Sequence, residues 1–423
     1  MEAKDSQAKA SNAADKVARV GKVDKVNKVD RDGKVDSVNN DLKVSNDNHT
    51  RHPKHGWEVK PFEDCILKVK YPTKIPSSHY LKEGVYPIVS QEDELISGYW
   101  NNINDIFKVT SPVVIFGDHT RIIKYVDFDF VLGADGVKIL QPIKDIKAKF
   151  LKLYLEYSKI PSLGYSRHYK LLKEISLPIP PMEEQERIVA ELDCLSGVIE
   201  KKRQQLKEYD ALAQSIFYDM FGDPISNEKG WKVKKLGDIC DVRDGTHDSP
   251  KYLEQSEYLL ITSKNITADG NIDFTTANYI SKQDYDAINK RSCVDKGDII
   301  MAMIGTIGKP IIVKNVDKMF SIKNVALVKF CSSTNVINTY IQSLLNNPSY
   351  RFHIQSQNKG GTQKFIALGT IRTLPIPCPP MELQREFADK IEAIEKQKEL
   401  LKRSIKEVET LFDARMEYYF GDT

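Results

Sequence analysis

One stretch of this chain occurs twice, at a constant offset of 199 residues. The first copy runs from Pro181-Met182-Glu183-Glu184-Gln185 to Phe221-Gly222-Asp223. The second runs from Pro380-Met381-Glu382-Leu383-Gln384 to Phe420-Gly421-Asp422. Both are preceded by Leu-Pro-Ile-Pro, at 177–180 and 374–377. A signature shared at both ends, without a gap between them, indicates a duplicated structural unit.

Each copy has the start and stop signals of a long helix. Proline opens the first turn, where its missing N–H costs nothing. Glutamates follow at the positive end of the helix dipole. Gly222 and Gly421 are helix terminators. We therefore predict two spacer helices, over 181–223 and 380–423, each about 57 Å long for about 38 residues.

The apolar side chains of both copies repeat in heptads, which indicates a coiled-coil seam rather than the wider face of a globular helix. Lys202, Lys398 and Arg415 interrupt this seam. Matched length and register favour pairing of the two helices, within one chain or between chains; the alternative is two unrelated amphipathic helices. The predicted seam residues are Leu192, Leu195, Ile199, Leu206, Ile216, Ile391, Ile394, Leu401, Ile405 and Phe412.

Composition limits the class of protein. A net charge of +3 does not by itself indicate a nucleic-acid binder, and hydrophobic residues at 41% are sufficient for real cores. The six cysteines form no C-x-x-C pair, so we expect reduced thiols without a disulfide framework or a metal site. With no apolar run of membrane-spanning length, we expect a cytoplasmic protein.

The rest of the chain divides into a tail and two globular domains. Residues 1–55 are low in complexity and rich in Lys-Val-Asp and Lys-Val-Asn, which predicts a disordered tail. Two globular segments, each of ordinary domain size, follow at 56–180 and 224–379. They open alike, with Gly56-Trp57-Glu58-Val59-Lys60 and Gly230-Trp231-Lys232-Val233-Lys234. The plan is domain, helix, domain, helix.

The two globular segments differ in sequence but share an order of predicted elements, which gives a mixed α/β (α+β) fold class. A hairpin, a strand, a helix and a polar loop precede each Leu-Pro-Ile-Pro. In the first segment the predicted hairpin strands, third strand and helix are 113–116, 121–126, 136–140 and 149–157. In the second they are 298–304, 311–313, 324–330 and 336–346.

No catalytic constellation is evident in the sequence. Gly308-Lys309 is followed by Pro310, so there is no phosphate-binding G-x-x-x-x-G-K-[ST], and no H-E-x-x-H occurs. Asn347-Pro348-Ser349-Tyr350 resembles an amino-methyltransferase loop but lacks its second proline, and a helix end explains it better. Basic and amide side chains on loops suit phosphates and base edges. These DNA-binding candidates are Arg121, Lys124, Arg167, His168, Lys264, Asn265, Lys309, Lys323, Asn324, Gln363 and Lys364.

Taken together, the repeated Leu-Pro-Ile-Pro…Pro-Met-Glu-x-Gln motif, the helices, the Phe-Gly-Asp ends and the Gly-Trp-x-Val-Lys openings resemble the specificity (S) subunit of a type I restriction-modification system. Gly305-Thr306-Ile307-Gly308-Lys309 is similar to a segment common in its recognition domains. The resemblance covers about 56–423.

This resemblance implies two target-recognition domains, each reading one half of a split DNA site. It implies that the spacer helices pair antiparallel in one molecule and fix the gap between the half-sites. Two DNA methyltransferase subunits would dock around the helices, and a restriction/translocase subunit would join them. The chain itself would be non-catalytic, because methyl donor, ATP and Mg belong to the partner subunits.

Two other functions remain open from the residues alone. One is a coiled-coil scaffold protein without DNA specificity, which would dimerise through its helices. The other is a self-targeting nuclease or methyltransferase, which would need a cofactor-binding or metal-binding motif.

Overall fold

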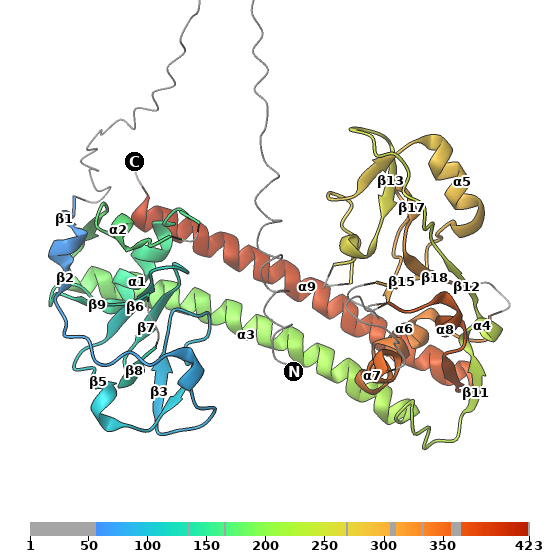
Figure 1. The fold of residues 1–423 in the computed structure, drawn as a ribbon, viewed down its shortest axis with the longest axis horizontal. Coiled ribbons are helices and arrows are strands. Elements are labelled where there is room, and N and C mark those ends of the chain that lie inside the picture. The colour runs from blue at the N-terminus through green and yellow to red at the C-terminus, as the bar shows by residue number, and fades with distance from the viewer. Residues whose placement is uncertain are drawn as a thin grey trace, which may run out of the picture. The chain divides into compact units, whose positions relative to one another are not determined.

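The computed structural model describes residues 56–421 apart from 134–135, 165, 268–269, 305–309, 331–333 and 357–364. The predicted tail over 1–55 lies outside the described residues. Figure 1 shows two groups of strands with short helices, and two long helices, α3 and α9, that lie side by side. The fold is a mixed α/β fold, as the sequence predicts.

The first domain contains two four-stranded sheets. One has the order β2-β9-β6-β7 and is antiparallel; the other has the order β4-β3-β8-β5, in which β3 and β8 are parallel. Its elements are β1 (Glu58–Pro61), β2 (Ile66–Leu67), β3 (Tyr86–Val89), β4 (Gly98–Trp100), β5 (Ile106–Phe107), β6 (Val113–Gly117), β7 (Ile123–Val126), β8 (Phe130–Leu132), β9 (Val137–Pro142), α1 (Ala148–Tyr157), α2 (Tyr169–Leu172) and β10 (Ser176–Ile179).

The second domain has a related topology built from different residues, with one sheet of four strands and a second sheet of three rather than four. Its sheets have the orders β12-β18-β15-β16 and β14-β13-β17, and β13 and β17 are the parallel pair. Its elements are β11 (Lys232–Lys235), α4 (Leu236–Ile239), β12 (Asp241–Asp244), β13 (Tyr258–Ile261), β14 (Asn278–Ile280), α5 (Lys282–Ser292), β15 (Ile299–Ala302), β16 (Ile311–Ile312), β17 (Met319–Ile322), β18 (Val325–Lys329), α6 (Asn338–Asn346), α7 (Pro348–Ser356), α8 (Leu368–Arg372) and β19 (Pro375–Cys378).

The predicted hairpins are present as the antiparallel pairs β6–β7 and β15–β16. Several predicted boundaries differ from the observed ones by one or two residues, and two of the starts have a clear cause. Strand β7 begins at Ile123 rather than at 121, because Arg121 has a positive φ of 63° that no strand allows. Helix α6 begins at Asn338 rather than at 336, because Ile337 is extended. The second sheet of each domain was not foreseen.

The two repeated motifs that flank each domain are partner strands. In the first domain β1 pairs antiparallel with β10, so that Lys60 lies opposite Leu177. In the second domain β11 pairs with β19, so that Lys234 lies opposite Ile376. Each of these two pairs is an isolated two-stranded ribbon. Prolines are tolerated in it because one edge of every strand forms no backbone hydrogen bonds to another strand. The ribbon joins the opening of the domain to the start of the long helix.

The long helices are α3 (Met182–Phe221) and α9 (Met381–Phe420), each 40 residues long, or about 60 Å at 1.5 Å per residue. They run antiparallel, because contacts between them join early residues of α3 to late residues of α9: Glu191 meets Arg415, and Asp210 meets Lys398. The pairing is within one chain.

Each domain core contains the beginning of its own helix and the end of the other helix. In the first domain Ile188 and Leu192 of α3 share a buried cluster with Met416 and Phe420 of α9. In the second domain Phe387 of α9 shares a cluster with Phe217 and Phe221 of α3. The repeated phenylalanine of Phe-Gly-Asp is therefore an aromatic anchor that fastens the end of each helix to the opposite domain.

Candidate DNA interface and the helix pair

In the first domain, the turn between β6 and β7 lies against the segment that precedes α2. The guanidinium of Arg121 in the turn donates a hydrogen bond to the carbonyl of Ile160 at 2.9 Å. The Nδ1 atom of His168 lies 2.9 Å from the carbonyl oxygen of Asp118. The fold therefore brings together the two loops that carry the first-domain candidates. Of these candidates, Arg121 and Arg167 are exposed.

The other two first-domain candidates hold loops in place. Lys124 is 6% exposed, and its ammonium donates to the carbonyls of Ser90 and Glu94. Burial lowers the pKa of Lys124, against the opposing effect of the acidic side chains at 92–94. His168 is fully buried, and its Nε2 accepts a hydrogen bond from the backbone N–H of Leu163 at 2.9 Å. With both nitrogens used inside the domain, His168 has no atom free for DNA.

The second-domain candidates divide in the same way. Lys264 is exposed, whereas Asn265 is buried and completes a capping box with Thr262. Lys323 is buried, and its ammonium donates to the hydroxyl of Ser249. These two buried side chains are structural. Lys309, Gln363 and Lys364 lie outside the described residues.

Residues next to two of the undescribed segments of the second domain, 305–309 and 357–364, contact each other. Ile304 precedes 305–309, Phe365 follows 357–364, and the two form an antiparallel bridge. The backbone N–H of Ile366 also donates to the carbonyl of Met303 at 2.9 Å. The hairpin and the segment before α8 are therefore adjacent, as the corresponding hairpin and segment are in the first domain.

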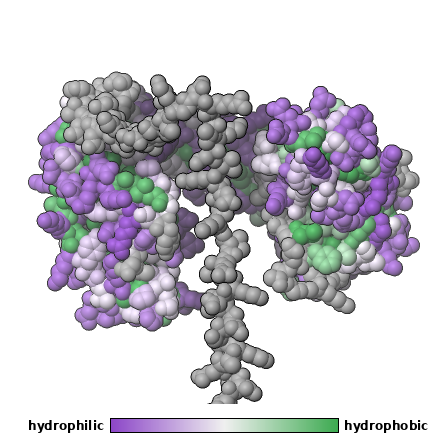
Figure 2. All heavy atoms as spheres, turned by 45° about the horizontal axis from the view of Figure 1, so that its top comes forward, coloured by the Kyte–Doolittle hydropathy of each residue, from purple (hydrophilic) through white to green (hydrophobic). Residues whose placement is uncertain are grey.

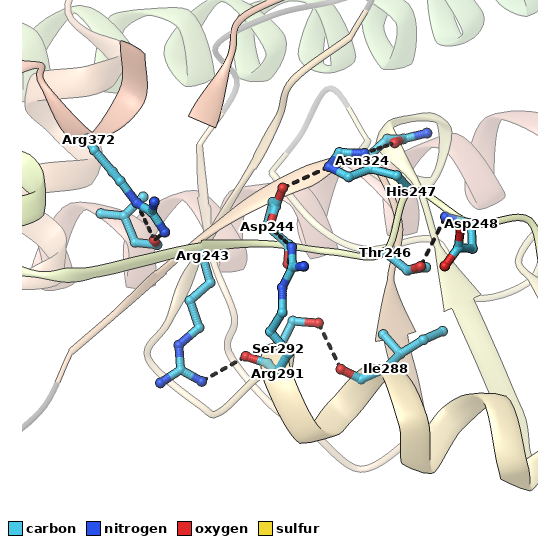
Figure 3. Close-up of polar contacts among 11 residues, drawn as sticks. Arg243, Asp244, Thr246, His247, Asp248, Ile288, Arg291, Ser292, Asn324 and Arg372 are labelled. Atoms are coloured by element: carbon cyan, nitrogen blue, oxygen red, sulfur yellow. Dashed lines mark hydrogen bonds and ion pairs between the residues drawn. The ribbon is translucent and has the colours of Figure 1, made fainter. Parts of the chain in front are cut away.

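A chain of polar side chains lies beside this bridge (Figure 3). His247 Nε2 lies 2.8 Å from Asp244 Oδ2, and His247 Nδ1 lies 2.9 Å from Asn324 Oδ1. Asp244 is buried and also forms an ion pair with Arg291. A cavity of about 340 Å³ adjoins these polar side chains, and its apolar wall includes Ile304 and Phe365.

This arrangement orients Asn324, whose φ of 55° places it in the left-handed region that asparagine tolerates. A carboxylate–imidazole pair fixes one edge of its amide and leaves the other atoms for a ligand. Sequence reasoning found Asn324 but missed Asp244, His247 and Arg291. The sequence Asp244-Gly245-Thr246-His247 contained one signal for this site, because Asp-Gly is typical of turns. In the structure a Cβ on Gly245 would clash with the backbone of Ile322.

Within the helix pair, the predicted seam residues are buried or half-buried, and ion pairs accompany them. Arg203 Nη2 lies 2.6 Å from Glu409 Oε1. Lys398 Nζ, in the seam, lies 2.8 Å from Asp210 Oδ1 and also contacts Glu395. Although burial opposes it, the hydrogen bonds that the ammonium donates to these two carboxylates raise the pKa of Lys398. The charge that Lys398 places in the seam is thus neutralised by two carboxylates.

Arg415, the second charge in the seam of α9, has its partner in α3. Its guanidinium forms an ion pair with Glu191, and the hydroxyl of Tyr419 donates to Glu191 Oε2 at 2.6 Å. The guanidinium carbon lies 4.6 Å and 4.7 Å from the ring centroids of Tyr418 and Tyr419. The hydrogen bond from Arg415 lowers the pKa of the Glu191 carboxyl.

The face of the molecule seen in Figure 2 is mostly hydrophilic, with small and separate hydrophobic patches. In the described ranges, no helix is long and apolar enough to cross a membrane. No group of three or more His, Cys, Asp or Glu side chains that could hold a metal ion occurs within the part of the chain that the structure describes.

These features define a protein with two globular domains of related topology but different loops, which pack on opposite ends of an intramolecular helix pair. Comparison with known families identifies the class. The model of the type I restriction modification DNA specificity domain matches residues 54–208 and 228–410. The chain belongs to this family, and it is a DNA-recognition subunit of the type I restriction-modification class, the non-catalytic component of such a system.

Similar proteins agree with this assignment. The chain is 23% identical over 393 residues to the type I restriction enzyme MjaVIII specificity subunit of Methanocaldococcus jannaschii, covering 84% of this chain and 89% of that protein. It is 27% identical over 285 residues to the MjaIX specificity subunit of the same organism, covering 62% and 63%. The crystal structure of the S subunit from M. genitalium has the same fold, with a TM-score of 0.54 and 13% identity over 90% of this chain and 99% of that chain.

Proposed function

We propose that each globular domain binds one half of a bipartite DNA site, and that α3 and α9 fix the gap between the halves. One observation carries this proposal: two domains that share a four-stranded sheet and a parallel strand pair, but differ in sequence, stand on helices of equal length. Equal helices support a fixed separation, and different loops support two different half-sites. The bound DNA would therefore be asymmetric, unlike the palindrome that a homodimer favours.

The hairpin turn and the neighbouring loop of each domain are the proposed DNA contacts. Arg121 and Arg167 are the exposed candidates of the first domain, and Lys264 is exposed in the second. Asn324 joins them because its amide is oriented by His247. Arginine and lysine suit phosphates and guanine edges, and an asparagine amide suits adenine. Lys309, Gln363 and Lys364 remain proposed contacts of the second domain.

The helix pair is the proposed docking surface for two DNA methyltransferase subunits, and a restriction/translocase subunit would join them. Leu212 and Leu411 are related by the 199-residue repeat, and both are exposed apolar side chains, at 47% and 49%. Repeat-related exposed leucines support two copies of one partner. The partners would supply the methyl donor, ATP and Mg, and the assembly would act in the cytoplasm.

The intramolecular pairing disfavours the scaffold alternative. A scaffold that dimerised through its heptads would need a free seam, whereas the seam of α3 is occupied by α9 of the same chain. The hydrodynamic mass of the isolated chain distinguishes the two functions: a monomer of 48.2 kDa is expected, and a dimer would support the scaffold.

Methylation mapping of DNA from cells that express the chain with its methyltransferase tests the proposal directly. One split motif with a fixed gap is expected, and the absence of any split motif would overturn it. Inserting one heptad into both helices should lengthen the pair by about 10 Å, or about three base-pair steps. The gap should grow while the half-sites stay the same; an unchanged gap would refute the role of the helices in spacing.

A further inference from the structure

The repeat contains two buried glutamines at equivalent positions. Gln185 lies in the first turn of α3 and Gln384 in the first turn of α9, and neither has any exposed surface. We call them the bridging glutamines. A fully buried amide at the same place in both copies requires partners for its donors and its acceptor.

Each bridging glutamine joins its long helix to the domain helix beside it. Gln185 Oε1 accepts the backbone N–H of Lys147 at 2.8 Å, and Gln384 Oε1 accepts the backbone N–H of Ile337 at 2.9 Å. Lys147 and Ile337 are the N-cap residues of α1 and α6, and neither cap makes a side-chain hydrogen bond. The glutamine thus supplies, from another helix, the contact that a capping box normally makes within one helix.

The same amides also hold the backbone at the start of each long helix. Gln185 Nε2 donates to the carbonyls of Pro180 and Asp145, at 3.0 and 2.8 Å. Gln384 Nε2 donates to the carbonyl of Pro379 at 2.8 Å. Strands β10 and β19 lie 199 residues apart, as α3 and α9 do, so Pro379 is the structural counterpart of Pro180. The two connections have the same length, and the same bond is made in both.

Only a neutral amide of this length meets these requirements. Glutamate would suit the positive end of a helix dipole, and the neighbouring Glu183, Glu184 and Glu382 follow that preference. A carboxylate, however, cannot donate to a proline carbonyl. A neutral side chain at both positions, against the local preference, indicates that its simultaneous donor and acceptor bonds are needed.

We propose that the bridging glutamines are positioning residues that fix the direction in which each long helix leaves its recognition domain. Three segments meet at each amide: the domain helix, the connection from the ribbon, and the long helix. The connection itself is a single chain at Pro180 or Pro379, and the amide adds hydrogen bonds across it to the core packing of the first turns of each helix. This inference rests on the proposed function, because a fixed helix direction sets the gap between half-sites only if the domains bind them.

The test measures gap selectivity. Gln185→Met and Gln384→Met keep the length of the side chain and remove its hydrogen bonds. Gln205→Met and Gln397→Met, at exposed positions of the same helices, are the matched controls. Each full-length variant is assembled with its methyltransferase, and methylation is measured on DNA libraries in which the native half-sites are separated by the native gap, one base pair less, or one more.

The bridging variants should retain the half-sites but lose about tenfold in preference for the native gap, as expected for loss of one buried hydrogen-bonded contact. The controls should keep that preference. If the bridging variants keep it too, or lose methylation equally at all gaps, the glutamines have only a structural role and the inference is wrong. Should a methionine variant fail to fold, Gln185→Asn and Gln384→Asn, which retain an amide but shorten its reach, are measured by the same ratio.

The two proposals fail differently. If the unaltered complex shows no gap preference, the spacing function itself is wrong. If the unaltered complex shows a gap preference and the bridging variants show the same preference, only the role of the glutamines is refuted.

Discussion

Phe420 ends α9 and fastens it to the first domain. Its ring is 6% exposed and lies 5.5 Å from Phe150, 5.6 Å from Tyr154 and 5.7 Å from Tyr157, measured between ring centroids. Replacing Phe420 with alanine removes these three aromatic contacts with the first domain. Because these partners belong to α1, the loss should fall on the first domain and not on the second.

The expected loss follows from the buried area. A phenylalanine buries about 200 Å², which corresponds to about 5 kcal/mol at 25 cal/mol per Å². Alanine retains part of this burial, and phenylalanine-to-alanine changes in cores cost about 3–5 kcal/mol. We therefore expect about 4 kcal/mol. For a slope of about 2 kcal/mol per M, the urea midpoint of the first domain should fall by about 2 M.

The three tryptophans allow each domain to be followed separately. Trp57 and Trp100 lie in the first domain and Trp231 in the second, so a Trp231→Phe background reports the first domain by fluorescence. Leu400→Ala, at an exposed position of α9, is the control. A midpoint shift no larger than that of the control, or a shift confined to the second domain, would refute the assignment of Phe420 as an anchor.

Three further predictions concern other parts of the molecule. Phe221→Ala should destabilise the second domain by about 3–5 kcal/mol, detected with Trp231 as the only reporter, and an effect limited to the first domain would contradict the cross-packing of the helices. Arg167→Ala should reduce the salt slope of DNA binding by about 0.9, whereas Lys124→Met, which removes a buried lysine, should leave that slope unchanged; equal effects would show that burial does not separate the candidates. Glu191 and Arg415 should show a coupling of about 0.5–1 kcal/mol in a double-mutant cycle by urea unfolding. The pKa of Glu191 is lowered in the folded chain, so this coupling energy should be present above the ordinary carboxyl pKa and should disappear as the pH falls through the pKa of the folded state. A coupling energy that does not change with pH would refute the ion pair.

Local patterns predicted the elements well where several signals agreed. The hairpins, the third strand and the domain helix of each segment followed from alternating apolar residues and turn signals. The parallel pairs β3–β8 and β13–β17 could not be predicted, because their partners lie far apart in sequence and no local pattern records such pairing. The start of β7 was wrong because Arg121 still belongs to the turn: its N–H donates to the carbonyl of Gly117, and its φ is positive.

The candidate DNA site was predicted as a list of chemically suitable residues, and the structure separated them by burial. Four candidates have side chains that suit DNA, but they are buried and form hydrogen bonds inside the domains: Lys124, His168, Asn265 and Lys323. Sequence does not distinguish a lysine that holds a loop from a lysine that faces solvent, because both occur in polar segments. Asp244 and His247 were missed for the converse reason, since their partner Asn324 is distant in the sequence.

The sequence by itself determined the duplicated plan, the equal length of the two helices and the register of their apolar side chains. These properties are local or periodic, so the order of residues records them directly. Only the tertiary structure decided that the helices pair within one chain, that Arg415 meets Glu191, and that Gln185 and Gln384 are buried between helices. Such contacts depend on which distant segments share a core, and that is settled by the packing of the whole chain.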